Sequence, residues 1–142
     1  MPVKISWTLF WALVAVFAII AIAVFIPPVR EAIMNFRFLI ISGTIFSLLG
    51  GALIFWTAKE RMDELLGKFL ILTGASAIGI FVSVLLHNVL YGLFIYWFGA
   101  GFWDRIGLAD EPFFFFMGII VCPAAFLIGT VGTMVLAIKR AR

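Results

Sequence analysis

Residues 69–103 read FLILTGASAIGIFVSVLLHNVLYGLFIYWFGAGFW, a run of 35 residues without a single Asp, Glu, Lys or Arg. An α-helix rises about 1.5 Å per residue, and the hydrocarbon core of a bilayer is about 30 Å thick. A fully helical run of this length would measure about 52 Å and would exceed the bilayer. We therefore expect a transmembrane helix over 69–98, whose end near Gly92, Gly99 and Gly101 emerges from the membrane, bends or lies along its surface.

The same separation of charged and apolar residues continues along the chain. All 17 charged residues fall within five short segments, and three further uncharged blocks lie at 5–29, 38–58 and 112–138. Each block has the roughly 20 residues that a helix needs to span a bilayer. The 142 residues are 65% hydrophobic and 12% charged, with one cysteine, whereas soluble domains carry about 25% charged residues. This composition excludes a soluble domain, a disordered chain, a nucleic-acid-binding protein and a disulfide scaffold.

Lipid cannot hydrogen-bond an exposed backbone, so the blocks must form helices or the strands of a closed barrel. Barrel strands alternate apolar and polar residues over about 10 positions, and these runs are continuously apolar. The first block is also longer than the apolar core of about 7–15 residues in a signal peptide. We therefore predict an all-α fold, a single integral membrane four-helix bundle covering residues 1–142, with helices at approximately 5–26, 38–58, 69–98 and 112–138.

The basic residues predict the orientation of this bundle. With four spans, both termini and the 59–68 loop share one side, which carries seven Lys and Arg residues against three on the other side. Short loops rich in Lys and Arg stay in the cytoplasm. We therefore expect cytoplasmic N- and C-termini in a multi-pass protein of the prokaryotic inner (plasma) membrane, and no nucleic-acid partner.

Local signals set the expected helix ends. Pro27 should end the first helix, because proline lacks an N–H and the residue before it leaves helical geometry. The 59–68 segment should extend one of its flanking helices into water. Asp110 is the expected N-cap of the fourth helix, and Pro112 suits its first turn.

Small residues predict which helix faces pack, because they let backbones approach closely inside lipid. At 100° per residue they gather on one face of each of the last three helices: Gly43, Ser47, Gly50 and Gly51; Ala75, Gly79 and Ser83; and Gly118, Cys122, Ala125, Gly129 and Gly132. The first helix has no Gly, Ser or Thr between Leu9 and Ile26, so we expect a tight core of the last three helices with the first at the periphery. Pro123 should kink the fourth helix, structurally or as a hinge, because it removes a hydrogen bond to the Ile119 carbonyl.

The third helix carries a polar stripe. Within about 80° of one another lie Thr73, Ser76, Ser83, His87 and Tyr91, with Asn88 beside them. Unsatisfied polar groups in lipid cost several kcal/mol, so the stripe should face away from lipid. No Asp, Glu, Lys or Arg lies within the four blocks, which argues against a proton- or sodium-coupled carrier. Counted from Phe69, His87 lies about 27 Å along the helix, and we place it in the outer leaflet.

His87 is the residue on which intramembrane chemistry would depend, and several roles stay open. It can be a structural histidine hydrogen-bonded between helices, the lining of a substrate or lipid pocket, a proton-transfer group, or an axial ligand of haem. A metal site with Asp104, Asp110 and Glu111 matches no known ligand spacing, and a Ser83–His87 hydrolytic pair lacks a nucleophile elbow. We predict no catalytic residue, no metal and no cofactor, with haem bound through His87 as the alternative.

Five segments carry a family resemblance: LTGASA at 72–77, LHNVLY at 86–91, DEPFF at 110–114, CP at 122–123 and FLIG at 126–129. Together they resemble a family of small prokaryotic four-span membrane proteins of uncharacterised function. The resemblance covers about the last half of the chain and implies no activity.

These features favour a non-enzymatic small integral membrane protein. We predict an accessory or structural subunit of a larger or homo-oligomeric membrane assembly, whose partners are the lipid bilayer and another membrane protein or a second copy of the chain. The alternative is a small transporter, channel or lipid-binding protein lined by Ser83, His87 and Tyr91. A third possibility is a haem-binding membrane anchor that uses His87.

Overall fold

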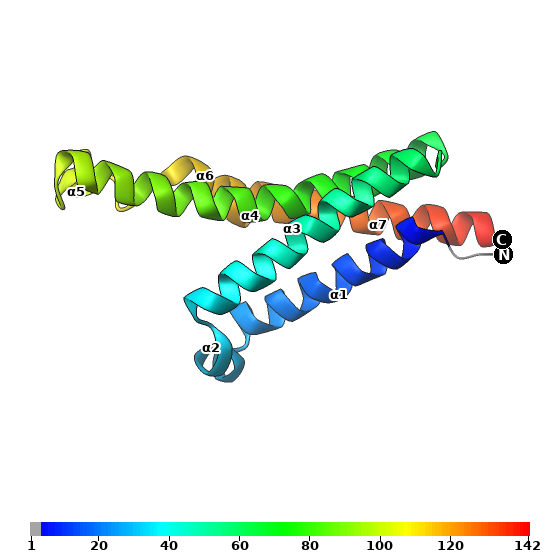
Figure 1. Ribbon diagram of the computed structural model, residues 1–142, viewed down its shortest axis with the longest axis horizontal. Coiled ribbons are helices and arrows are strands. Elements are labelled where there is room, and N and C mark those ends of the chain that lie inside the picture. The colour runs from blue at the N-terminus through cyan, green and yellow to red at the C-terminus, as the bar shows by residue number, and fades with distance from the viewer. Residues whose placement is uncertain (1–3) are drawn as a thin grey trace.

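The computed structural model describes residues 4–142 as a chain of helices (Figure 1). Four helices are long and apolar enough to cross a membrane, and the last of them is a continuous run over Pro112–Ala141. The predicted all-α bundle with four candidate spans is therefore confirmed. The elements in chain order are α1 (Ile5–Phe25), α2 (Pro27–Ile33), α3 (Phe36–Lys59), α4 (Glu64–Phe98), α5 (Phe102–Arg105), α6 (Pro112–Phe116), the π-helical turn η1 (Met117–Val121) and α7 (Cys122–Ala141).

The helices form two arms that meet at one end (Figure 1). One arm consists of α1 and α3, and the other of α4 alongside α6, η1 and α7. The start of α1, the end of α7 and the turn between α3 and α4 lie together, and we refer to this as the terminal end. The arms diverge toward the opposite, distal end, where α2 closes the first arm and α5 the second.

The central helix α4 packs through opposite faces against α3 and α7. On one face, a Cβ atom added to Gly50 of α3 would lie 2.5 Å from the carbonyl oxygen of Gly74. On the other face, a Cβ atom on Gly129 of α7 would lie 2.5 Å from the Oγ1 atom of Thr73. Backbone approach this close requires glycine, which explains why small residues gather on these helices.

Two predicted packing residues lie outside these contacts. Ala75 is exposed, because it is about 100° around the helix from Gly74 and so falls between the two packed faces of α4. A Cβ atom on Gly51 would meet no atom within 4 Å, since this glycine turns away from α4. The other predicted small residues are buried or half-buried: Gly43, Ser47, Gly79, Gly118, Cys122, Ala125 and Gly129.

Helix α1 lies beside α3 and still contributes to the core. Its Phe10 and Leu13 side chains are fully buried. The ring of Phe17 stacks on Phe126 of α7, with ring centroids 4.5 Å apart. Large side chains make this contact, and the sequence prediction considered only small residues, so it missed the contribution of α1 to the core.

Most helix ends follow the local signals in the sequence. α1 ends before Pro27, which opens the short helix α2, because a proline at the first helical position sacrifices no hydrogen bond. Residues 64–68 of the 59–68 segment extend the start of α4, in line with the predicted extension of a flanking helix, and Asp63 accepts hydrogen bonds from two N–H groups of the first turn. α4 then continues unbroken through Gly92 and ends at Gly99, whose φ of 89° is incompatible with a helix.

The backbone irregularity at Pro123 is a π-helical turn immediately before it. The Cys122 N–H donates to the carbonyl of Met117, five residues back. A turn of this kind accommodates the carbonyls that would otherwise face the missing N–H of a proline and crowd its ring. It also places Gly118 against the Ser83 side chain of α4.

Candidate functional site

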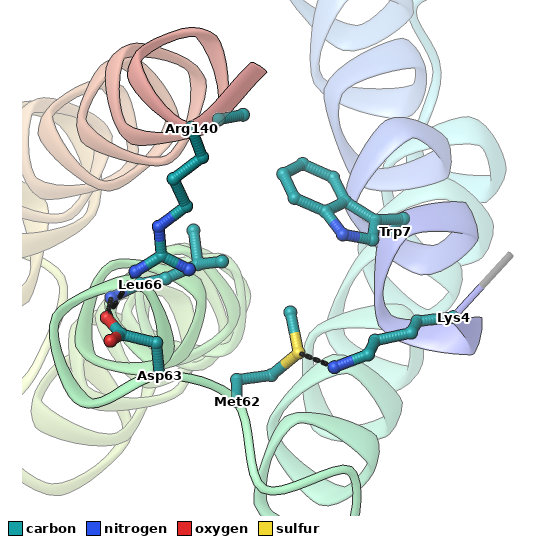
Figure 2. A pocket seen from close by; sticks show the side chains of 7 residues that line it. Lys4, Trp7, Met62, Asp63, Leu66 and Arg140 are labelled. Atoms are coloured by element: carbon teal, nitrogen blue, oxygen red, sulfur yellow. Dashed lines mark hydrogen bonds and ion pairs between the residues drawn. The ribbon is translucent and has the colours of Figure 1, made fainter. Parts of the chain in front are cut away.

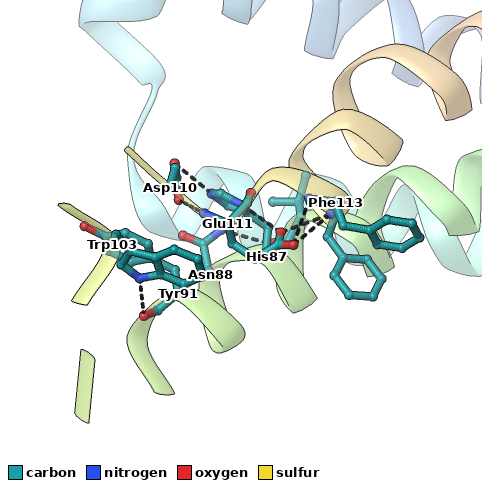
Figure 3. Close-up of polar contacts among 9 residues, drawn as sticks. His87, Asn88, Tyr91, Trp103, Asp110, Glu111 and Phe113 are labelled. Carbon is teal, nitrogen blue, oxygen red and sulfur yellow. Dashed lines mark hydrogen bonds and ion pairs between the residues drawn. The ribbon is translucent and has the colours of Figure 1, made fainter. Parts of the chain in front are cut away.

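A polar cluster forms at the distal end where α4 meets the start of α6 (Figure 3). The Nδ1 atom of His87 lies 3.1 Å from the Glu111 carbonyl oxygen and 3.4 Å from the Glu111 Oε2 atom. Its Nε2 atom lies 3.4 Å from the Oδ2 atom of Asp110. Both ring nitrogens therefore face oxygen acceptors, and the side chain is only 16% exposed.

Glu111 holds this cluster together and starts the last helix. Its carboxylate accepts hydrogen bonds from the N–H groups of Phe113 at 2.8 Å and Phe114 at 3.0 Å. A negative charge at a helix N-terminus is favourable, because the first N–H groups have no partner within the helix. The prediction that Asp110 is the N-cap of this helix was wrong. Its shorter side chain accepts from the N–H of the next residue at 2.7 Å, and Glu111 occupies the capping position instead.

The predicted polar stripe divides at His87. Thr73, Ser76 and Ser83 are buried, and the Thr73 hydroxyl donates to the Phe69 carbonyl of its own helix at 2.9 Å. Thr73 and Ser83 pack against Gly129 and Gly118, so this half of the stripe is a close contact between α4 and the last span. The two residues beyond His87 behave differently: Asn88 and Tyr91 are exposed.

A small cavity lies beside His87, with a volume of about 180 Å³. Its walls are mostly apolar, and its polar groups come from His87 and Asn88; the lining residues are Val84, His87, Asn88, Phe114, Phe115, Gly118 and Ile119. Pockets for drug-sized ligands usually measure about 300–1,000 Å³. A haem iron would also have to displace Asp110 or Glu111 from the imidazole. Within residues 4–142, no group of three or more His, Cys, Asp and Glu side chains is arranged to hold a metal ion.

Beyond this cluster, residues 89–108 form a compact unit at the tip of the second arm, made of the end of α4, helix α5 and the following turn. We refer to this tip as the distal arm. The ring of Tyr91 stacks on Trp103 with centroids 5.8 Å apart and planes inclined by 8°. The Trp103 indole N–H donates to the Tyr91 carbonyl at 3.2 Å. Phe94 packs on Phe98 and Phe102 with centroids 5.8 and 5.2 Å apart. These contacts fix α5 against the end of α4.

The distal arm carries exposed aromatic side chains on this fixed scaffold. Tyr96, Trp97 and Phe98 are 82%, 61% and 52% exposed. At the other end of α4, Lys68 pairs with Glu64 and both side chains are largely exposed. Lys68 is the last charged residue before the apolar block, so we measure the length of a bilayer from Lys68. A hydrocarbon layer of about 30 Å then ends near residue 89, and the last nine residues of α4 extend about 13 Å further. The part of the third apolar block that exceeds the thickness of a bilayer therefore continues α4 without a break as far as Phe98.

Comparison with family models, curated proteins and solved structures finds no match to this chain. The resemblance to small prokaryotic four-span proteins therefore stays a prediction.

Proposed function

We propose that this chain is a non-catalytic membrane subunit that binds a second membrane protein through the distal arm. The observation that carries the proposal is the set of exposed aromatic side chains around the end of α4, Tyr96, Trp97 and Phe98, held on a packed aromatic scaffold. Tyr and Trp are enriched among the residues that contribute most to protein interfaces. A scaffold that is already ordered loses little conformational entropy when a partner binds.

The charge distribution supports an orientation with the terminal end in the cytoplasm. The terminal end carries seven basic and three acidic residues, and the distal end carries three basic and four acidic residues. Lys and Arg in short loops favour the cytoplasmic side. The distal arm then lies at the outer surface of a prokaryotic plasma membrane, where it meets the outer parts of other membrane proteins.

The test uses gentle extraction into native nanodiscs, followed by mass determination and identification of co-purifying chains. The wild-type protein should carry a stoichiometric partner or a second copy of itself. A variant with a photoreactive phenylalanine analogue in place of Tyr96, which keeps an aromatic ring at that position and leaves Trp97 in place, should cross-link to this partner. Substitution Trp97→Ala should weaken this association by at least tenfold, as expected for an interface Trp worth about 2 kcal/mol or more.

The matched control is Phe116→Ala, which removes an aromatic side chain of similar exposure (53%) from α6, outside the distal arm. Tyr and Trp also anchor proteins at the lipid interface, and a lipid anchor would give no specific cross-link from position 96. Isolation of the wild-type chain as a monomer without a bound protein would refute the proposal.

The cavity beside His87 favours a second candidate, a lipid-binding protein. Four of its lining side chains are large and apolar, while His87 and Asn88 provide polar groups at one place. Substitution Ile119→Trp should fill the cavity and lower the number of lipids that remain bound in native mass spectrometry. Ile120→Trp is the control, because Ile120 does not line the cavity and is exposed on the same turn.

A further inference from the structure

The terminal end holds a cavity of about 240 Å³ at the junction of three distant parts of the chain (Figure 2). One wall comes from the start of α1, one from the turn before α4 and one from the end of α7. The lining residues are Lys4, Trp7, Met62, Asp63, Leu66, Ala137 and Arg140. Two cations, an indole and two aliphatic side chains thus surround one space that lies far from the distal arm.

The two cations around this space have N–H donors beyond those used in their contacts with Met62 and Asp63. The Lys4 ammonium donates to the Met62 sulfur at 3.4 Å, and a thioether is a weak acceptor. The Arg140 guanidinium pairs through one terminal nitrogen with Asp63 at 2.5 Å, while a guanidinium has five N–H donors in total. Within residues 4–142, the Trp7 indole N–H has no hydrogen-bond acceptor. Figure 2 shows Lys4, directly before α1, and Trp7 of α1 reaching toward the same space as Arg140 of α7.

Asp63 orients the arginine without cancelling the charge of the site. Its carboxylate caps the start of α4 through two backbone N–H groups, so the position of the carboxylate is fixed by the helix. The hydrogen bond from Arg140 holds the pKa of Asp63 below its usual value, and the carboxylate is therefore ionised at neutral pH. The lining then has two positive charges and one negative charge, within an end of the molecule that is positively charged overall.

We propose that this cavity binds the phosphate group of an anionic lipid. Arg matches phosphate oxygens with paired N–H donors, and Lys supplies a compact positive charge. Basic pockets between transmembrane helices on the cytoplasmic side are suited to anionic headgroups. Trp7 is in the first turn of α1, at the depth where indole rings meet headgroups. Leu66 and Ala137 supply an apolar floor for the ester-linked carbons next to the phosphate.

The experiment places the full chain in nanodiscs of phosphatidylcholine, alone or with added phosphatidylglycerol, at about 150 mM salt. Native mass spectrometry counts retained phosphatidylglycerol, and thermal unfolding measures its stabilising effect. The expected result is saturable retention of phosphatidylglycerol. A parallel series adds inorganic phosphate to phosphatidylcholine nanodiscs. Equal stabilisation in that series would assign the site to a soluble phosphate compound and would overturn the lipid proposal.

Variants identify the cavity as the binding site. A hydrogen bond to a charged group contributes about tenfold or more in affinity, so Lys4→Gln and Arg140→Gln should each lower the apparent phosphatidylglycerol affinity by about tenfold or more. Trp7→Phe keeps the ring and the charge and should lower the affinity about twofold or more, because it removes one hydrogen-bond donor. This variant also tests the site if Arg140→Gln loosens α7.

The matched control is Lys139→Gln, which makes the same change of charge one residue from Arg140 and outside the cavity. This variant should retain wild-type affinity within twofold. An equal loss in Lys139→Gln and Arg140→Gln would show that anionic lipid is attracted by the general charge of this end, and would overturn the proposal. So would the absence of any retained phosphatidylglycerol in the wild-type protein. Neither result depends on whether the distal arm binds a partner.

Discussion

Substitution Gly50→Ala tests the contact between α3 and α4. The added Cβ atom would lie 2.5 Å from the Gly74 carbonyl oxygen, whereas ordinary contacts begin at 3.4 Å. The helices must therefore separate locally by roughly 0.9 Å, and a gap of about 0.5–1 Å already forfeits a quarter to a half of each affected van der Waals contact. Forced packing of this kind typically costs about 1–3 kcal/mol. Alanine also gains about 1 kcal/mol of helix propensity over glycine, which offsets part of that cost.

Gly51→Ala separates the two effects. The same gain in propensity applies one residue along the same helix, and the added Cβ atom meets no atom within 4 Å. The difference between the two variants therefore measures packing alone, and we expect Gly50→Ala to be less stable than Gly51→Ala by about 1–3 kcal/mol, or about five- to 150-fold in the unfolding constant. Reversible unfolding in mixed micelles, followed by circular dichroism, gives both values. Equal stability of the two variants would refute the close backbone contact.

Three further predictions concern the charged groups at the helix ends. Because Arg140 lowers the pKa of Asp63, their contact persists at neutral pH in the wild-type protein and is lost as the pH falls below about 4. Hydrogen exchange at the end of α7 should therefore rise in acid, and Asp63→Asn should remove this pH dependence. Glu60→Ala should destabilise the start of α1 by about 0.5–2 kcal/mol, since Glu60 accepts from the Ser6 hydroxyl at 2.6 Å and from a backbone N–H at 2.8 Å; faster amide exchange in that turn, with wild-type exchange in α7, is the expected pattern. Glu111→Ala should fray the first turn of α6 at a similar cost, and unchanged exchange there would contradict the capping role.

Hydropathy was sufficient to predict the number of spans, because each uncharged block must bury its backbone polar groups in lipid. It also predicted that the third block is longer than a bilayer requires. It could not distinguish a bent end from a straight projecting helix, since Gly92 is compatible with either. α4 continues to Phe98, and its end packs against α5 through aromatic contacts; the sequence did not show that the chain turns at Gly99 to make these contacts.

The candidate sites show the same limit more strongly. Helical periodicity put Ser83 and His87 on one face, and the face does turn toward α7 and α6. Helical periodicity could not show that glycines of the last span pack against the first half of the stripe, because this depends on which residues of another helix lie opposite. Asp110 fits the usual sequence preference for an N-cap residue. The capping role of Glu111 depends instead on its side chain folding back onto its own helix, which the sequence did not reveal.

The distribution of contacts along the molecule explains how the two proposed surfaces can coexist. At the terminal end, Glu60 joins α3 to the start of α1, and Asp63 joins the start of α4 to Arg140 at the end of α7. Each of these contacts fastens two helices of the same arm, while the hydrogen bond from Lys4 to Met62 joins the start of α1 to the turn between the arms. A phosphate bound there would therefore strengthen an existing junction. At the distal end the arms diverge (Figure 1), and the distal arm is stabilised within itself by the stacking of Tyr91 on Trp103. A partner can therefore bind the distal arm without displacing any helix of the core, and loss of either surface should leave the other intact.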